Sequence, residues 1–219
     1  IGYYFNGGMI VDSINELTSI YGQYSPDTNI AFFKEEVRLV NPNFVLTSDT
    51  LDYNTETKIA TILSSAEIVS DSGFIYSDRG WYNTVLEESM LFDRSLVVSK
   101  DETKTITADS MFYNKLEGYL EAYGDMVIND TARKAIIMGD FGYYDEVTNY
   151  AFATQRAQMI EYSQQDSLFL HADTLKMQTI GEEREIKAYH GVRFFREDMQ
   201  GVCDSMQFNT ADSLLYLYK

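Results

Sequence analysis

The sequence predicts an all-β protein built from a repeat of about thirty residues, and three observations lead to this fold class. The chain contains 17 tyrosines and 13 phenylalanines, spread through short segments, and aromatic side chains favour strands. Only 2 prolines occur, whereas 45% of the residues are apolar, which is enough for a folded core. The third observation is an aspartate that recurs at regular spacing.

This aspartate defines the repeat, because each copy follows a small residue and precedes a large apolar residue by four positions. The six copies are Asp49, Asp78, Asp109, Asp140, Asp173 and Asp204. Their spacings are 29, 31, 31, 33 and 31 residues. Such regularity indicates stacked structural units.

The residues around each aspartate predict a strand that bends. The preceding position holds Ser48, Ser77, Ala108, Gly139, Ala172 and Cys203. Three positions before the aspartate stand Leu46, Ile75, Ile106, Ile137, Leu170 and Gly201, and four positions after it stand Tyr53, Tyr82, Tyr113, Tyr144, Met177 and Phe208. Side chains alternate between the two faces of a strand, so the buried face changes parity at the aspartate. A bulge or sharp corner produces this change, and a small residue suits the crowding there.

Each unit then continues with a turn, a second strand and a short closing run. The turn begins at Asn54, Asn83, Asn114, Asp145, Gln178 and Asn209. Second strands are predicted over 57–64, 86–92, 118–123, 148–154 and 185–190, and closing runs over 66–69, 96–98, 126–128, 158–160 and 192–195. Near the start the register is imperfect: 9–11 resembles 126–128, and 21–23 resembles 138–140. About seven units are expected.

No linker separates these units, so residues 1–219 are interpreted as a single elongated domain. Stacked units contact mainly their neighbours, which leaves an unpaired strand at each end. We expect the sequence to be a piece of a longer exported protein, because it does not begin with Met and its last residue, Lys219, stops within an apolar alternation.

Composition argues against several classes of function. A formal charge of −17 repels nucleic acid over most of the surface. Cys203 is the only cysteine, and two histidines, His171 and His190, are too few for a convincing metal or acid–base site. No nucleophile elbow, Walker loop or dinucleotide motif occurs. We therefore expect no enzyme, no metal and no cofactor.

Five segments show the repeat most clearly: 46–54 (LTSDTLDYN), 107–114 (TADSMFYN), 124–128 (GDMVI), 169–175 (FLHADTL) and 201–206 (GVCDSM). They resemble the OstA-like family of lipopolysaccharide-transport proteins, and the last two look like later repeats of its Bacteroidetes-type members. The resemblance implies a slightly twisted, V-shaped β-jelly roll of stacked antiparallel strands. It also implies a periplasmic protein associated with the outer membrane that carries lipopolysaccharide. The implied partners are lipopolysaccharide or lipid A, together with other Lpt-type bridge components or further copies of the chain joined through edge strands.

An apolar stripe is the candidate acyl-binding groove. It comprises Leu46, Leu51, Tyr53, Ile75, Tyr82, Ile106, Met111, Tyr113, Ile137, Tyr144, Leu170, Leu175, Met177 and Phe208. On the pattern alone, core packing is the simpler interpretation, whereas the family resemblance favours a groove. Because the protein is acidic, lipid affinity has to come from acyl burial, with local phosphate contacts from candidates such as Arg133, Lys134, Arg193 and Arg196.

Other interpretations stay open at this point. A structural or adaptor β-repeat protein would assemble through its open sheet edges without binding lipid. A solenoidal glycosidase or lyase would also carry acids on stacked strands. The repeated aspartates are interpreted as corner staples that accept hydrogen bonds from Thr50, Ser110, Thr174 and Ser205, with calcium binding as the alternative. Trp81, Phe112 and Tyr143 lie on the opposite parity from the tyrosine stripe and predict an aromatic ladder on a second surface.

Overall fold

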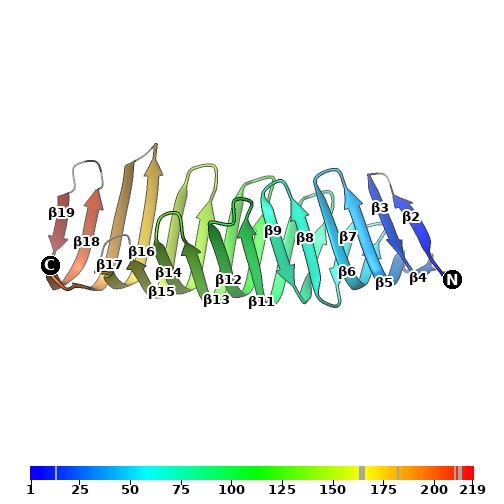
Figure 1. The fold of residues 1–219 in the computed structure, drawn as a ribbon, viewed down its shortest axis with the longest axis horizontal. Coiled ribbons are helices and arrows are strands. Elements are labelled where there is room, and N and C mark those ends of the chain that lie inside the picture. Colours follow the sequence, from blue (N-terminus) through cyan, green and yellow to red (C-terminus); the bar gives the residue numbers. More distant parts are fainter. Residues whose placement is uncertain (13, 163–165, 182, 210, 212–213) are drawn as a thin grey trace. The chain divides into compact units, whose positions relative to one another are not determined.

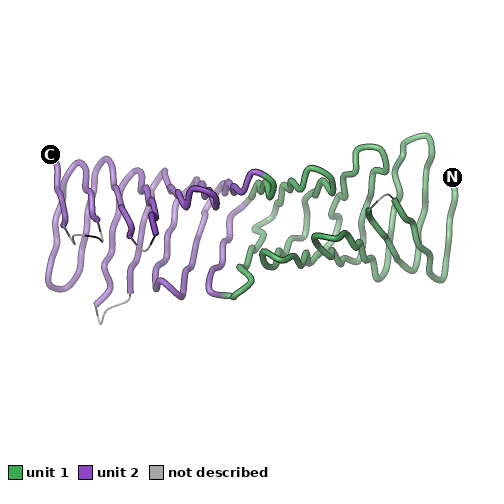
Figure 2. The backbone as a smooth tube through the Cα atoms, turned by 90° about the horizontal axis from the view of Figure 1, so that it is seen from above, with its two compact units in different colours: residues 1–102, 110–116 green, residues 103–109, 117–219 purple. Residues whose placement is uncertain are grey.

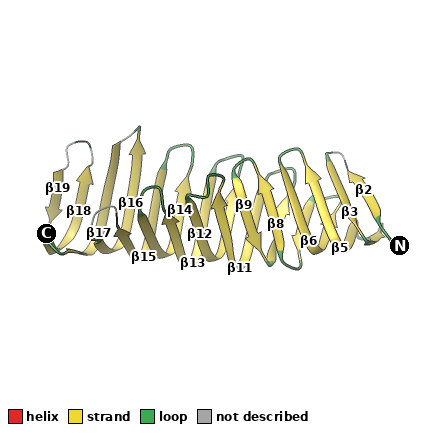
Figure 3. Cartoon of the chain, in the orientation of Figure 1, coloured by secondary structure: helices red, strands yellow, loops and turns green. Residues whose placement is uncertain are grey.

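A computed structural model describes residues 1–219 except 13, 163–165, 182, 210 and 212–213. The described residues form strands and turns and contain no helix (Figures 1 and 3). All strand pairs recorded for this part of the chain are antiparallel, for example β5 with β6 and β13 with β14. The predicted all-β fold class is confirmed. None of the described segments forms a helix of the length and apolarity that a bilayer crossing requires.

The chain divides into two compact units, which are coloured separately in Figure 2. Unit 1 comprises residues 1–102 and 110–116, and unit 2 comprises residues 103–109 and 117–219. The strands of unit 1 are β1 (Gly2–Tyr4), β2 (Gly8–Asp12), β3 (Asn15–Ser19), β4 (Tyr21–Ser25), β5 (Ile30–Asn41), β6 (Phe44–Asn54), β7 (Ile59–Ile62), β8 (Ala66–Ser70), β9 (Gly73–Ser77), β10 (Arg79–Asn83) and β11 (Glu88–Ser99). Those of unit 2 are β13 (Tyr119–Asp130), β14 (Ala135–Asp145), β15 (Tyr150–Glu161), β16 (Leu168–Ile180), β17 (Glu183–Arg196), β18 (Met199–Asn209) and β19 (Leu214–Tyr218). Strand β12 (Lys104–Asn114) contributes its first half to unit 2 and its second half to unit 1.

The strands bend at the repeated aspartates, as predicted. In the β5–β6 pair, Lys34 faces Thr50 and Val37 faces Ser48, so two residues of β5 lie opposite Asp49 alone. Unit 2 repeats this arrangement at Asp140, Asp173 and Asp204. A bulge of two residues opposite one bends a strand. The regular spacing of the aspartates is therefore the spacing of the corners.

The residues opposite the aspartates share an unusual backbone conformation. Both members of each pair have φ between 39° and 74°: Glu35–Glu36, Gly124–Asp125, Gln155–Arg156 and His190–Gly191. Asp93–Arg94, which lies beside Asp78, has φ values of 62° and 57°. Left-handed backbone is uncommon outside glycine, and four of these five pairs contain at least one charged residue. The sequence did not reveal this half of the corner.

The small residue before each aspartate lies where space is limited. Ala108 and Ala172 are fully buried. A Cβ added to Gly139 would lie 3.0 Å from the carbonyl oxygen of Thr154. The side chains of the aspartates accept hydrogen bonds from Thr50 Oγ1 at 3.1 Å, Thr174 Oγ1 at 3.1 Å and Ser205 Oγ at 2.8 Å, as predicted for those three residues.

Two details of the predicted repeat are wrong. The second strands and closing runs are not separated by a turn: 118–123 and 126–128, for example, are the two halves of β13, which continues through the left-handed pair. Only 57–64 and 66–69 remain divided, as β7 and β8. The first corner lies at Ile20 and not within 21–23, since Ile20 donates its N–H to the Glu35 carbonyl at 2.9 Å and accepts from the Gly7 N–H at 2.8 Å. An apolar residue in place of the aspartate concealed this corner.

The predicted turns after the corners are confirmed at several positions. The Asn54 side chain accepts the N–H groups of Glu56 and Thr57, both at 2.9 Å. Asn83 and Asp145 cap their turns in the same way. The turns also stack, because Thr84 donates its N–H to the Lys58 carbonyl at 3.0 Å.

Within unit 1 the corners join two facing sheets. The first half of β6 pairs with β8 and its second half pairs with β7. Strands β2, β3, β8 and β9 belong to the first sheet and β1, β4, β7 and β10 to the second, while β5, β6 and β11 run through both. The sheets contact each other across the interior, where the Phe44 and Tyr82 rings lie 4.5 Å apart.

The interior of unit 1 is filled by large side chains. Ten of the twelve largest fully buried side chains lie there, and only two lie in unit 2: Tyr53, Phe33, Leu17, Leu39, Leu46, Leu51, Ile62, Leu91, Met111 and Val37 against Met126 and Leu170. In unit 2 the remaining fully buried positions are mostly small, for example Ala122, Ala157 and Ala188, with Val192 the largest of them. Large, fully buried side chains are therefore concentrated in unit 1.

Candidate functional site

The predicted apolar stripe lies inside both units, with different degrees of burial. In unit 1, Leu46, Leu51, Tyr53 and Met111 are 0% exposed and Tyr82 is 5% exposed, while Ile75 and Tyr113 are half-buried. In unit 2, Ile106, Leu170 and Leu175 are buried, while Ile137, Tyr144, Met177 and Phe208 are half-buried. The interior faces of the repeat are thus where the parity argument placed them, although their role as an acyl site stays a prediction.

An apolar cavity lies in the interior of unit 2. Its walls include the stripe residues Ile137, Leu175 and Met177, together with Ile128 and Ile186. Its volume is about 30 Å³, which is room for about two water molecules. An acyl chain does not fit into this space, so the structure shows the interior in a closed state.

Tyr144 occupies the border of this interior. It lies opposite Leu120 and Ala151 in the sheet, and the ammonium group of Lys104 stands 5.1 Å from its ring centre. Burial raises the pKa of the Tyr144 hydroxyl. The residue therefore combines an apolar ring at the interior with a cation over that ring, an arrangement that is stabilising when shielded from water.

A buried polar cluster lies inside unit 1, and no sequence pattern indicates it. Asn15 donates from Nδ2 to Tyr53 Oη and to Thr84 Oγ1, both at 3.0 Å, and accepts from Asn41 Nδ2 at 2.8 Å. Tyr53 Oη in turn donates to Asp12 Oδ2 at 2.8 Å. Buried polar groups need partners of this kind, and here the partners come from both sheets.

The cluster changes the chemistry of Tyr53. Burial, together with its hydrogen bond to the Asp12 carboxylate, raises the pKa of Tyr53 to about 12. The ring of Tyr53 is part of the predicted apolar stripe, whereas its hydroxyl is committed to this polar cluster. Burial also raises the pKa of Tyr82.

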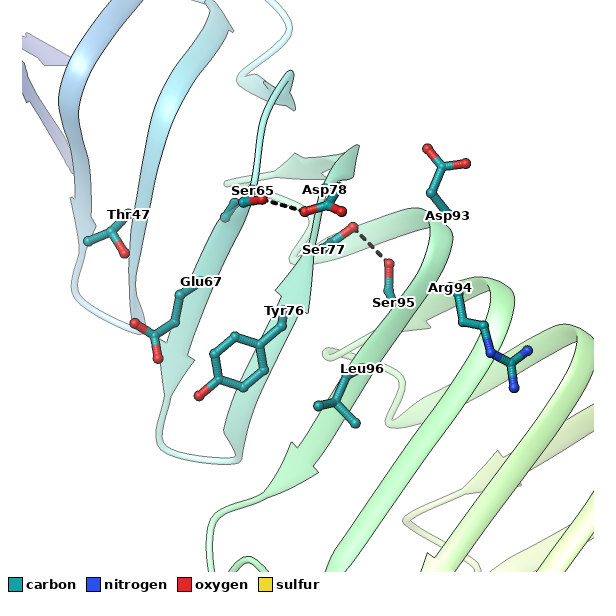
Figure 4. A pocket seen from close by; sticks show the side chains of 11 residues that line it. Thr47, Ser65, Glu67, Tyr76, Ser77, Asp78, Asp93, Arg94, Ser95 and Leu96 are labelled. Carbon is teal, nitrogen blue, oxygen red and sulfur yellow. Dashed lines mark hydrogen bonds between the residues drawn. The ribbon is translucent and has the colours of Figure 1, made fainter.

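A separate polar depression of about 460 Å³ lies along the corner of unit 1 (Figure 4). Ser65 donates to Asp78 at 2.5 Å, and Ser95 donates to Ser77 at 2.8 Å. Glu67, Tyr76 and Arg94 also line it, and their side chains are labelled in Figure 4. None of the described residues that line this depression belongs to the apolar stripe, so it is distinct from the candidate lipid site.

Tyr143, one member of the predicted aromatic ladder, belongs to a local cluster of rings in unit 2. The Tyr143 ring stacks on those of Tyr119 and Phe152, with centroids 5.9 and 5.6 Å apart. These residues belong to three neighbouring strands, β13, β14 and β15, and they face away from the side that carries Tyr144. Cross-strand neighbours therefore build the surface, which repeat spacing alone did not show.

Two of the four predicted phosphate contacts are engaged within the protein. Arg133 binds Asp130 at 2.7 Å, and Arg196 binds Asp198 at 2.6 Å. Lys134 and Arg193 are exposed. Among the residues that the structure describes, no group of three or more His, Cys, Asp or Glu side chains is placed to hold a metal ion.

The geometry defines a class of protein: antiparallel β-repeats with aspartate corners and an apolar interior between two sheets. Comparison with known families agrees, because the model of the OstA-like protein family matches residues 1–49 and 35–109. Through this N-terminal part the chain belongs to the OstA-like family.

Among solved structures, one that is similar to this chain is LptH, described as the LptA homologous periplasmic component of the conserved lipopolysaccharide transport device from Pseudomonas aeruginosa. It is 12% identical, with a TM-score of 0.46, and the similarity covers 52% of this chain and 80% of LptH. None of the curated proteins matches the sequence.

Proposed function

We propose that this protein binds lipopolysaccharide through its acyl chains and takes part in its transport across the periplasm to the outer membrane. Membership of the OstA-like family supports this role. The observation that carries the proposal is the interior of unit 2, where the stripe residues Ile137, Tyr144, Met177 and Phe208 are only half-buried and a small apolar cavity persists. Separation of the sheets there exposes an apolar surface and costs less packing than in unit 1.

Acyl burial supplies the affinity in this proposal. Each methylene removed from water contributes about 0.8 kcal/mol, so a chain of about twelve carbons outweighs the modest cost of separating a loosely filled interior. The net charge of −17 opposes phosphate groups, which makes this apolar term necessary. In this mechanism the protein carries out no covalent chemistry.

Sheet edges provide the second part of the proposal. All five residues of β19 are large and apolar, and they are 39–50% exposed: Leu214, Leu215, Tyr216, Leu217 and Tyr218. On the described residues, β19 is hydrogen-bonded to β18 through 205–209. An apolar edge strand is a template for pairing with another chain. We propose that further copies or other bridge components pair here, and the same observation favours the alternative of an adaptor that binds no lipid.

Lipid binding is tested by substituting two neighbouring tyrosines that lie on opposite faces of β14. Tyr144→Gln places an amide at the interior, whereas Tyr143→Gln changes the outer face of the same strand. A fluorescent fatty acid and competing lipid A should bind the Tyr144→Gln variant about tenfold more weakly than the wild type, and the Tyr143→Gln variant with unchanged affinity. Equal affinities for all three proteins would contradict an interior site, and absence of binding to the wild type would favour the adaptor.

A further inference from the structure

A row of side-chain bridges closes unit 1 on the side opposite its corners. We call this side the mouth, because the turns of the first sheet and of the second sheet meet there. Asp12, at the end of β2, binds Lys58 Nζ at 2.6 Å. Asn43, between β5 and β6, donates to Glu87 at 2.7 Å. Asp71, between β8 and β9, lies 3.3 Å from Lys115 Nζ.

The bridges follow the repeat. Each joins a turn of the first sheet to the turn of the second sheet that follows 44 to 46 residues later. Lys115 links two of them, because it also lies 3.3 Å from Glu87. Successive rungs therefore place equivalent bridges side by side, and the bridges form a row along the mouth.

Both lysines of this row are shielded more than ordinary surface charges. The side chains of Lys58 and Asp12 are 26% and 17% exposed, and those of Lys115 and Glu87 are 21% and 13% exposed, while Asp71 is the open partner. Partial removal from water strengthens the attraction between charges and makes an unpaired partner costly. Directly behind the first bridge lies the buried polar cluster around Asn15, which connects the same two sheets.

We propose that this row is a latch over the interior of unit 1, and that a lipid phosphate opens it by taking Lys58 and Lys115 from their carboxylate partners. A phosphate group is an alternative anionic acceptor for a lysine ammonium. When the two lysines bind phosphate instead, Asp12, Asp71 and Glu87 lose their cation. These carboxylates and the phosphate then repel one another across the mouth. Because large side chains fill the interior of unit 1, phosphate alone does not part its sheets; they part only when acyl chains of the same lipid enter between them, in addition to the site proposed in unit 2. This inference rests on the proposed lipid-binding function.

The test compares two lipids with identical acyl chains, bisphosphorylated lipid A and its dephosphorylated form. Wild-type protein should bind the phosphorylated lipid roughly tenfold more tightly, the effect of about one favourable charged contact. Lys58→Met with Lys115→Met should bind both lipids equally. Lys34→Met with Lys219→Met, which removes the same charge from exposed positions at a corner and after β19, should keep the wild-type preference.

Opening of the mouth is measured by hydrogen–deuterium exchange in the turns 41–44, 54–59 and 83–88. Phosphorylated lipid should raise their exchange in the wild type. Inorganic phosphate should weaken binding of phosphorylated lipid, leave dephosphorylated lipid unaffected and not raise exchange by itself. If inorganic phosphate alone raised exchange in these turns, free phosphate and not the lipid would be the ligand that opens the latch, and the proposal would be overturned.

If the lysine variant fails to fold, a second variant that changes the carboxylates tests the latch instead. Asp71→Asn with Glu87→Gln retains both lysines and weakens the latch, so both lipids should bind faster than to the wild type. Unchanged rates, or a lysine variant that keeps the phosphate preference, would refute the latch while leaving lipid binding intact. Absence of binding of either lipid to every protein would refute the proposed function itself.

Discussion

At the scale of single residues, Tyr53 shows how one side chain can serve two environments. Its ring belongs to the apolar stripe and is 0% exposed, while its hydroxyl joins Asp12 and Asn15 in the buried cluster. Deprotonation would place a phenolate beside the Asp12 carboxylate, away from solvent. The neutral hydroxyl is therefore part of the folded structure.

This environment predicts a specific loss of stability at high pH. The folded pKa of Tyr53, about 12, lies above its ordinary value of 10.0, so the folded state holds this proton more tightly than the unfolded state. The resulting stabilisation is fully present below pH 10 and is lost as pH rises through the folded value of about 12. Tyr53→Phe should flatten that part of the curve of unfolding free energy against pH, measured by chemical denaturation between about pH 9 and 12.

The same substitution should lower stability at neutral pH by about 1–2 kcal/mol, because Asp12 and Asn15 each lose a hydrogen-bond partner. Tyr216→Phe, on the exposed strand β19, is the matched control and should change neither quantity. A Tyr53→Phe variant that keeps the full alkaline decline would contradict this account.

At the scale of elements, the corner is the unit from which the fold is built. An aspartate on one strand lies opposite a pair of left-handed residues on the strand before it, and the pairing register shifts at that point. Gly124 shows how closely the parts approach, because a Cβ at this position would lie 2.5 Å from Asp109 Oδ2. Its φ of 74° is also unfavourable for other residues.

Two glycines at equivalent corners allow the stability cost of steric crowding to be measured apart from the cost of backbone strain. Gly191 has a φ of 64°, and a Cβ added there would have no neighbour within 4 Å, whereas Gly124 has both positive φ and a close neighbour. Gly191→Ala should therefore cost about 1 kcal/mol, from backbone conformation alone. Gly124→Ala should cost about 2–3 kcal/mol, because Asp109 has to move as well. Thermal and denaturant unfolding measure both, and equal losses would show that the Asp109 contact is unimportant.

At the scale of the whole molecule, the sheet continues by adding rungs, so its edges decide how copies associate. The apolar side chains of β19 are exposed on both faces of the strand. Pairing with a further strand would bury these side chains.

Charges on this edge should therefore block assembly. Leu215→Lys with Leu217→Lys is expected to convert concentration-dependent oligomers into monomers in analytical ultracentrifugation, because lysines are disfavoured at a paired apolar edge. Val147→Lys with Leu116→Lys changes exposed apolar residues in turns and should leave assembly unchanged. Wild-type protein that stays monomeric at high concentration would contradict pairing through β19.

Much of the fold follows from the sequence because its signals are local. The aspartate, the small residue before it and the apolar residues on either side fix where a strand bends and which face is buried. Glu35–Glu36 and Gln155–Arg156 carry no such signal, since charged residues do not normally predict left-handed backbone. The corner at Ile20 was missed because it lacks the aspartate altogether.

The sequence by itself determined the repeat, the positions of six corners and the apolar parity of the interior, since these depend on neighbours within one strand. Only the tertiary structure decided how full that interior is and what closes it. Packing density depends on side chains that meet between two sheets, and the bridges of unit 1 join residues 44 to 46 positions apart. Contacts at that separation are created by the stacking of rungs, and no local pattern encodes them.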